Sequence, residues 1–456
     1  MDFVSTSLVN LTQPSGFWPS ILNAFKSGVG TYIVAVILVA ILVRILFSVV
    51  DIINKKVNMK NMDLNAKMKP ELDAIQKRYG NDQRVLQQKQ SEIYKKYQFS
   101  MMGSCVPMLI TMILQFTVFL TLWNSLQAIA NYNISYQYEN MKYLYTNVIM
   151  LNDDEGTNPQ ATTLKGYIDA AKTANAEYDM EADLVEIDGV KKLQITFVCN
   201  DLGENQKLDF DYEDFSGEER ISNQEIFEIL NKYVIKKAEE PTPGEGEESG
   251  TTALEFNTDT GYNEIFKALA EKTSKQYFQK TQEKFLWVKN IYRPESTTNP
   301  MFTKGEITKY LNTYYSKEEK ELEEANKYEE KIFDCVIGEN SSLDEIRKEK
   351  NGYYILTILA VLSSFFSIWL SNRLMKRKDQ PAQPANKMMY FIMPIIMGIF
   401  TSMYTSMFAI YIIVGQLMMI ALTPLTTLIV KKWVEADAKK KKEKDVIDVD
   451  YRRKDI

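Results

Sequence analysis

A single arginine stands inside an apolar run, and its type and position suggest the clearest chemistry in the chain. The run extends from Thr31 to Val50, and Arg44 is its only charged residue. About 20 apolar residues can cross a bilayer as a helix, and an arginine at mid-span costs about 2.5–3.5 kcal/mol on insertion scales. The apolar runs of this sequence contain no Asp or Glu to pair with it. Arg44 therefore predicts a polar, water-containing space among the helices, although its long side chain could instead reach the membrane surface.

A few uncharged polar residues also interrupt the apolar runs. A hydrogen bond between neighbouring helices is the simpler interpretation for any one of them. Taken together with Arg44, they are candidates for the lining of a polar space. They are Thr111, Gln115 and Thr117 in one run and Gln416 and Thr423 in another.

The residue types on which most enzymes depend are missing or isolated. The chain has no histidine, which is the usual general base and metal ligand, and no phosphate-binding glycine loop. Ser363 and Ser364 have no lysine or histidine near them in the membrane to activate a hydroxyl. The three cysteines, at 105, 199 and 335, do not make a metal site, and a disulfide between Cys199 and Cys335 stays open because spacing does not decide it. We expect no enzyme activity, no cofactor and no metal.

The apolar runs predict five transmembrane helices. The last run, residues 388–430, is about twice the length of one span and contains no charge, and the polar stretch 401–406 divides it. Residues 16–29, within the N-terminal segment 1–30, form an amphipathic pattern that suits a helix in the membrane interface. The expected spans are residues 31–50, 106–128, 353–371, 388–403 and 406–430.

The charge of the connecting segments predicts how the chain crosses the membrane. Lys and Arg outnumber Asp and Glu by 11 to 6 in residues 51–100, by 5 to 1 in residues 372–387 and by 10 to 7 in the tail 431–456. Residues 131–351 instead carry 26 Lys and Arg against 45 Asp and Glu. By the positive-inside rule, we expect the N-terminus and the acidic region 131–351 outside and the C-terminus in the cytoplasm.

The two longest connecting segments have different patterns. Residues 51–100 predict a basic helical hairpin with a turn at Gly80-Asn81-Asp82, and we expect Pro70 to break or kink its first arm. Such a hairpin could contact anionic lipid, a nascent chain or RNA, or could simply link two spans. Residues 131–351 predict a small α+β domain. Its expected elements are a β-hairpin at 182–199 with Asp188-Gly189 at the turn, a helix at 222–237 capped by Ser222 and Glu225, an acidic linker at 239–252 and a charged helix at 316–334.

Several of these segments, about half of the chain, together resemble the YidC/Oxa/Alb family of membrane-protein insertases. Arg44 stands at the position of the family's groove arginine, Gln115 at that of a mid-span glutamine and Tyr411 at an aromatic position. The similar segments are "YIVAVILVAILVRILFSVV" (32–50), "MKPELDAIQKRYGND" (68–82), "GSCVPMLITMILQFTVFLTLW" (103–123), "FLWVKNIYRPES" (285–296), "GYYILTILAVLSSF" (352–365), "NKMMYFIMPIIM" and "TSMFAIYIIVGQL".

The chain also departs from the family's pattern. Thr117 and Thr357 replace prolines that are usual in the family, and Ile412 stands where a tryptophan is common. The second span is about one turn longer. Residues 131–284 and 297–351 lie outside the pattern, so the family implies no function for them.

The resemblance implies a five-helix insertase core with a cytoplasmic helical hairpin, in an all-α polytopic membrane protein that carries an extracytoplasmic α+β insertion. It implies insertion and folding of other membrane proteins through a hydrated groove, alone or with the Sec translocon. The implied partners are nascent membrane-protein substrates, the ribosome and membrane lipids, with the chain acting as a monomer in the bacterial plasma membrane. The groove residues would be Arg44, Thr111, Gln115, Thr117, Tyr411 and Gln416.

Two other interpretations remain open at this point. A small-solute channel or transporter is one, although such proteins usually show internal repeats and paired ionisable residues in their spans. A membrane-anchored scaffold that acts through its external domain is the other, although an anchor needs one span and no buried arginine.

Overall fold

A computed structural model of the chain divides into two compact units. We call residues 15–127 and 353–456 the helical unit, and residues 1–14 and 128–352 the acidic unit. The structure describes residues 13–97, 99, 101–152, 159–203, 205–211, 223–233, 235–236, 255–256, 261–296, 300–314, 319–338, 343–375 and 384–454.

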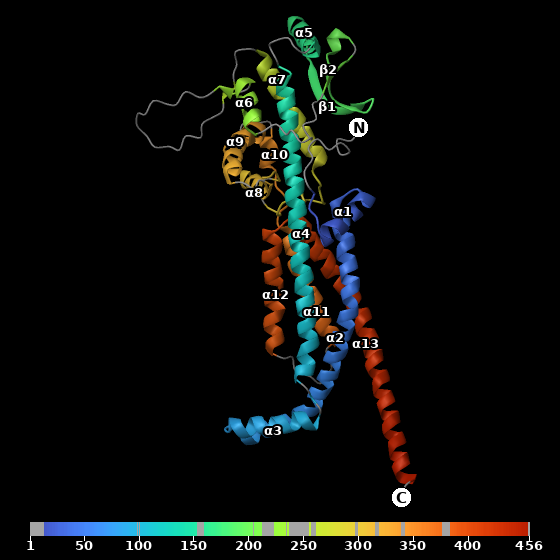
Figure 1. Ribbon diagram of the computed structural model, residues 1–456. Coiled ribbons are helices and arrows are strands. Elements are labelled where there is room, and N and C mark those ends of the chain that lie inside the picture. Colours follow the sequence, from blue (N-terminus) through green and yellow to red (C-terminus); the bar gives the residue numbers. More distant parts are fainter. Residues whose placement is uncertain are drawn as a thin grey trace, which may run out of the picture. The chain divides into compact units, whose positions relative to one another are not determined.

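The helical unit is a bundle of long helices (Figure 1). Helix α13 packs against α2 and α11, and α11 packs in turn against α12. Among the described residues, four helices are long and apolar enough to cross a membrane, namely α2, residues 109–150 of α4, residues 355–374 of α11 and residues 406–437 of α13. Residues 391–403 of α12 are apolar but shorter. The helices of the unit are α1 (Phe17–Val29), α2 (Tyr32–Tyr79), α3 (Gln83–Lys96), the first part of α4 (Met101–Met150), α11 (Ile355–Met375), α12 (Pro384–Met403) and α13 (Ser406–Lys454).

Small residues let the helices of this unit approach closely. A Cβ added to Gly398 of α12 would lie 2.6 Å from the Cγ2 atom of Val361 of α11, so only glycine fits at this contact. In lipid the hydrophobic effect does not drive helices together, so close packing contacts of this kind stabilise their association. On α2, the buried residues recur at three- and four-residue spacing, as expected for one packed helix face. They are Ala35, Val36, Val39, Ala40 and Val43.

Three helices extend well beyond the predicted spans. Helix α2 continues to Tyr79, α4 continues to Met150 and α13 continues to Lys454. Of the two expected effects of Pro70, a break is excluded, because α2 runs through this residue. Packing against α3 holds α2 together on both sides of the proline and offsets its missing hydrogen bond. Met68 is buried there, and Glu71 accepts hydrogen bonds from Lys96 Nζ and Tyr97 Oη, each at 2.7 Å.

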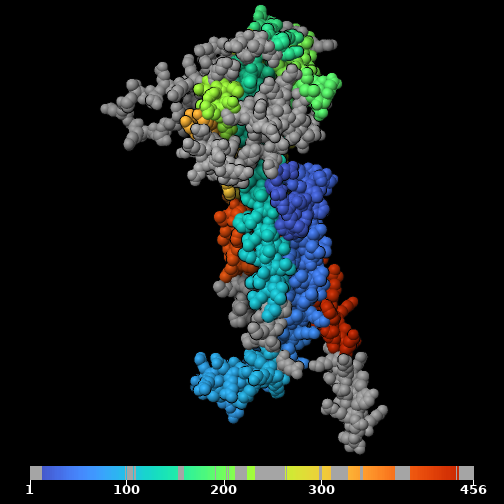
Figure 2. All heavy atoms as spheres, in the orientation of Figure 1, coloured from blue at the N-terminus to red at the C-terminus, as the bar shows by residue number. Residues whose placement is uncertain are grey.

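The end of α2 and helix α3 form the basic hairpin that the sequence predicts (Figure 2, light blue). Its turn lies at Gly80-Asn81-Asp82, as expected. Asp82 caps α3, because its Oδ1 atom accepts hydrogen bonds from the backbone N–H groups of Arg84 and Val85 at 3.1 Å each. Ile93 of α3 is buried in the hairpin.

Helix α1 lies against the start of α2 (Figure 2, dark blue). Leu22 is fully buried, whereas Phe17 is exposed. The indole N–H of Trp18 donates to Thr121 Oγ1 at 2.9 Å and joins α1 to α4, and Tyr32 Oη donates to Asn23 Oδ1 at 2.7 Å. Helix α1 is thus held by its contacts with α2 and α4 while Phe17 remains exposed, which agrees with a position of α1 in the membrane interface.

The acidic unit is an α+β domain, and its main sheet has the order β1-β2-β3 with antiparallel pairing. The predicted β-hairpin is confirmed, with Asp188 (φ 54°) and Gly189 (φ 78°) at the two turn positions. The described elements are α5 (Pro159–Thr173), β1 (Asp179–Ile187), β2 (Val190–Val198), η1 (Asn200–Leu202), β3 (Gln206–Asp211), α6 (Asn223–Tyr233), β4 (Ile235–Lys236), β5 (Glu255–Phe256), α7 (Gly261–Thr281), α8 (Lys304–Tyr314), α9 (Glu319–Ile337) and α10 (Asp344–Lys348).

The second half of α4 forms the core of the acidic unit. Met141, Leu144, Tyr145 and Val148 are all buried and recur at three- and four-residue spacing. The helix therefore does not stop at residue 128, because its apolar face continues into a second core. Cys199 and Cys335 are free, buried thiols. The predicted cap at Ser222 and the acidic linker 239–252 lie outside the described residues.

Candidate functional site: a charged seam between two spanning helices

Arg44 of α2 is half-buried and contacts α13 at two residues. Its Nη1 atom lies 3.3 Å from the Sδ atom of Met419. A Cβ added to Gly415 would lie only 3.0 Å from the Nε atom of Arg44, so glycine at this position makes room for the guanidinium. Within the described part of the chain, Nε has no hydrogen-bond partner.

These contacts leave the guanidinium poorly satisfied. It carries five N–H donors, and the thioether of Met419 is a weak acceptor. The charge of Arg44 also acts on Asp51, two helical turns further along α2, but no ion pair joins the two among the described residues. A half-buried guanidinium in this condition is suited to bind water or an incoming acceptor group.

Of the residues predicted with Arg44, Thr111 and Thr117 of α4 differ in burial. Thr111 is buried and accepts a hydrogen bond from Asn54 Nδ2 at 2.8 Å, which joins α4 to α2. Thr117 is exposed, and its hydroxyl donates to the carbonyl of Ile113 in its own helix. Gln115 is half-buried. Among the described residues, Arg44 forms no hydrogen bond with Thr111, Gln115 or Thr117.

Tyr411 and Gln416 of α13 are both buried. Gln416 directly follows the Gly415 that contacts Arg44, yet in the described structure no hydrogen bond joins Gln416 to Arg44. The predicted groove residues thus lie on α2, α4 and α13, and among the described residues no hydrogen bond joins Arg44 to the other five.

Sequence reasoning missed a row of cations that continues from Arg44 along α2. Lys55 Nζ donates to Thr426 Oγ1 of α13 at 2.7 Å. Lys56 lies 3.4 Å from the ring centroid of Trp433, and Lys56 and Lys60 pair with Asp437 at 3.0 and 3.4 Å. We call this row the α2–α13 seam; it comprises Arg44, Lys55, Lys56 and Lys60 of α2 with Gly415, Met419, Thr426, Trp433 and Asp437 of α13. The lysines recur along α2 at a spacing visible in the sequence. Their partners on α13 become clear only because that helix continues to Lys454.

One part of this chain is similar to a known protein family. Residues 24–166 match the family described as 60Kd inner membrane protein. This region contains α2, α3 and α4, and with them Arg44, Thr111, Gln115 and Thr117. Tyr411 and Gln416 lie outside it.

Three curated relatives are named membrane protein insertase YidC. The chain is 36% identical to that of Oleidesulfovibrio alaskensis over 105 residues, which are 23% of this chain and 18% of the relative. It is 31% identical to that of Fusobacterium nucleatum over 103 residues, 23% and 48% of the two chains, and 30% identical to that of Clostridium tetani over 118 residues, 24% and 50%. The chain thus spans half or less of the length of these relatives. No solved structure matches it significantly.

The four apolar helices and these relatives together define a multi-pass bacterial membrane protein. Residues 24–166 carry this similarity to the 60Kd inner membrane protein family and to relatives named YidC.

Proposed function

We propose that this protein inserts other membrane proteins into the bilayer and helps them fold. The observation that carries the proposal is Arg44, a half-buried and poorly satisfied guanidinium in an apolar helix, within the region that matches the insertase family. The curated relatives are named insertases, which favours insertion over a solute channel or a scaffold. Insertases are not a classical enzyme family, and the proposal involves no covalent step.

The proposed mechanism follows from the cost of moving polar groups through lipid. A polar segment that crosses hydrocarbon loses its water, and each unsatisfied backbone group then costs several kcal/mol. A groove hydrated around Arg44 would let the polar flank of an incoming chain travel part of the way while solvated. The positive charge of Arg44 would attract acidic residues in that flank. The apolar helix of the client would leave along methionine-containing surfaces that adapt to different side chains.

The topology and the partners are part of the proposal. We infer five crossings, with α12 as the fourth, an external N-terminus and acidic unit, and a cytoplasmic hairpin and C-terminal tail, because basic residues concentrate in the connecting segments of one side. The partners would be nascent membrane proteins, the ribosome and the Sec translocon, with the protein acting as a monomer.

The experiment is an insertion assay in liposomes that contain the purified protein. The clients are single-span proteins whose translocated flank carries either acidic or neutral residues. We expect Arg44→Ala to reduce insertion of the acidic clients at least fivefold and that of the neutral clients less. Arg44→Lys should retain most activity, because a long cation can still be solvated at this position.

The matched control is Ser48→Ala, one turn further along α2. Ser48 donates a hydrogen bond only to the carbonyl of Ile45 in its own helix, so its loss should leave insertion unchanged. Full activity of Arg44→Ala on every client would refute the proposed role of the arginine.

A further inference from the structure

A tight turn in the acidic unit exposes a leucine in an unusual backbone conformation. Phe285 and Val288 exchange backbone hydrogen bonds at 2.9 and 2.8 Å, so residues 285–288 form a two-residue hairpin turn. Leu286 occupies the left-handed region with φ 52° and is 74% exposed. Asn, Asp or Gly would adopt this φ more readily. A large apolar side chain at this position therefore indicates a use for the side chain itself.

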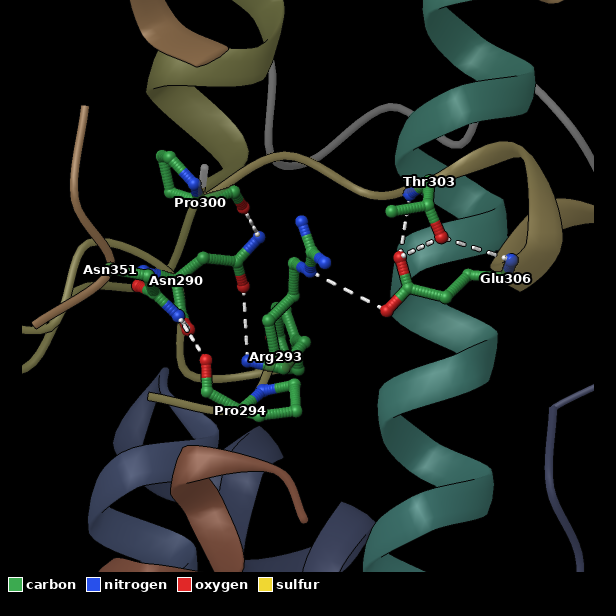
Figure 3. Close-up of polar contacts among 8 residues, drawn as sticks. Asn290, Arg293, Pro294, Pro300, Thr303, Glu306 and Asn351 are labelled. Carbon is green, nitrogen blue, oxygen red and sulfur yellow. Dashed lines mark hydrogen bonds and ion pairs between the residues drawn. The ribbon is translucent and has the colours of Figure 1, made fainter. Parts of the chain in front are cut away.

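Asn290, two residues after the turn, belongs to a network of hydrogen bonds with Asn351 and two prolines (Figure 3). Asn290 and Asn351 are fully buried and bind each other reciprocally: Asn290 N donates to Asn351 Oδ1 at 2.8 Å, and Asn351 Nδ2 donates to Asn290 O at 3.0 Å. Asn351 Nδ2 also donates to Pro294 O, and Asn290 Nδ2 donates to Pro300 O. Buried amides that are satisfied in this way rigidify a loop. The turn is consequently a fixed feature of the fold.

A second contact ties the turn to Gly352. The indole N–H of Trp287 donates to Glu295 Oε1 at 3.1 Å, and Glu295 is almost fully buried. A Cβ at Gly352 would lie 2.6 Å from the Cγ atom of Glu295, and Gly352 has φ 85°, so only glycine fits. In the chain, Gly352 stands three residues before Ile355, where the apolar helix α11 begins. The turn is therefore tethered to a residue that directly precedes a candidate membrane span.

The composition of the turn matches the membrane interface. Tryptophan is enriched at the level of the lipid headgroups, with its N–H satisfied and its ring in a partly apolar environment. Lys284 and Lys289 flank the turn and are exposed, as suits contact with anionic headgroups. Lys289 also pairs with Glu349 at 3.5 Å.

We propose that residues 285–288 anchor the acidic unit to the lipid surface, with Leu286 inserted at the boundary between headgroups and acyl chains and Trp287 at headgroup level. The occupant of this surface is lipid, because the turn is connected through Gly352 to the start of α11. This anchor is independent of the insertion activity proposed above.

The test places a fluorescent probe at the turn of the full-length protein. Cys105, Cys199 and Cys335 are replaced by alanine, and a single cysteine at Leu286→Cys carries the environment-sensitive probe NBD. The protein is incorporated into phosphatidylcholine and phosphatidylglycerol liposomes that contain lipids with a nitroxide near the headgroup. We expect the nitroxide to quench probe emission at residue 286 by at least half, while iodide in the buffer quenches it weakly.

Two control sites make the result specific. Val190→Cys probes another exposed apolar residue, at a hairpin turn of the same unit, and should be quenched by iodide only. Leu359→Cys probes an exposed residue of α11 and should be quenched by the nitroxide lipid. If Leu359→Cys is quenched by lipid and Leu286→Cys behaves like Val190→Cys, the anchor is refuted while the membrane position of α11 stands.

A second variant guards against disturbance of the turn by the probe. With NBD at Lys284→Cys, the additional change Leu286→Asp should reduce lipid quenching at least twofold and leave the circular dichroism melting curve unchanged. Equal lipid quenching with leucine and with aspartate would overturn the role of Leu286.

Discussion

Lys142 of the acidic unit is buried and Arg44 of the helical unit is half-buried, and the surroundings of these two cations differ. In the acidic unit, Lys142 of α4 is buried, and its Nζ atom lies 2.9 Å from Glu139 Oε1, 3.2 Å from Glu329 Oε2 and 3.1 Å from Asn223 Oδ1. In the helical unit, Arg44 has a methionine sulfur as its hydrogen-bond acceptor. Among the described residues, Lys142 has carboxylate partners at ion-pair distance and Arg44 has none.

This difference separates a structural charge from a functional one. A buried ion with complete partners holds its helices in one arrangement, here α4, α6 and α9, and removal of one partner leaves a stranded charge. A cation with few hydrogen-bond acceptors in its own chain can donate hydrogen bonds to acceptors of another molecule. We therefore interpret Lys142 as a structural residue and Arg44 as a binding residue.

The largest effect should follow from Lys142→Met. This change leaves Glu139 and Glu329 buried without their cation, so the free energy of unfolding of the acidic unit should fall by about 3–5 kcal/mol. Denaturation of the full-length protein in detergent, followed by protease sensitivity of the acidic unit, measures it. The exposed Lys207 of β3 provides the control Lys207→Met, which should change little. A loss near that of the control would mean that the buried cluster contributes no stability.

A smaller effect should appear in the pH dependence of the same unit. Burial raises the pKa of Glu329 above its ordinary value of 4.5, although Lys142 opposes the shift. The folded state therefore keeps a proton that the unfolded state releases, so the stabilising contribution is complete below pH 4.5 and declines as the pH rises toward the folded pKa. Glu329→Gln should abolish this decline, because glutamine does not titrate.

The same denaturation measurement at several pH values gives this slope. Glu181→Gln, at an exposed position of β1, should retain the slope of the parent protein. A parent protein whose stability rises with pH over this interval would show that Glu329 is already ionised in the fold and that Lys142 outweighs burial.

The smallest effect on stability should come from Arg44→Met, the counterpart of Lys142→Met. The hydrogen-bond acceptor of Arg44 is a methionine sulfur, so the substitution leaves no buried carboxylate without its partner. It also removes an insertion cost of about 2.5–3.5 kcal/mol. The unfolding temperature of the helical unit should thus stay the same or rise. A decrease of several degrees would make Arg44 a structural residue and would remove the contrast between the two cations.

The sequence predicted the parts of the fold that local pattern controls. Apolar runs located the helices that contain Arg44 and Tyr411, Asp188-Gly189 located a hairpin, and Asp82 located the start of α3. Each depends on residues within a few positions of one another. Whether Pro70 would break the first arm or only kink it was left open by the local sequence, and α2 continues through it beside α3.

The site was less predictable, since it depends on which helix faces meet. Thr111 accepts a hydrogen bond from Asn54 of α2, whereas Thr117 is exposed and bonds to its own helix, and the sequence pattern alone does not distinguish the two. Gly415 was overlooked, because a glycine in a span has several uses and only the contact with Arg44 identifies this one. The pairing of Lys56 with Asp437 requires α13 to continue beyond the membrane, and its charged sequence suggested a tail.

The most direct test of the central claim is whether water reaches Arg44 inside the bilayer. Met419→Cys, in a chain whose native cysteines are replaced by alanine, places a thiol at the residue that contacts Arg44. Leu417→Cys is the control, two residues away on α13 at a position that is more exposed in the protein alone. A thiol reacts with a polar maleimide as its thiolate, which forms in water and not in lipid.

In liposomes, we expect the polar maleimide to label Met419→Cys at least tenfold faster than Leu417→Cys, the reverse of the order that their exposure in the protein alone would give. Restoration of fast labelling at both positions in detergent would show that lipid protects Leu417→Cys. Labelling of neither residue in liposomes, with both labelled in detergent, would mean that Arg44 lies in a dry bundle and would contradict the hydrated groove.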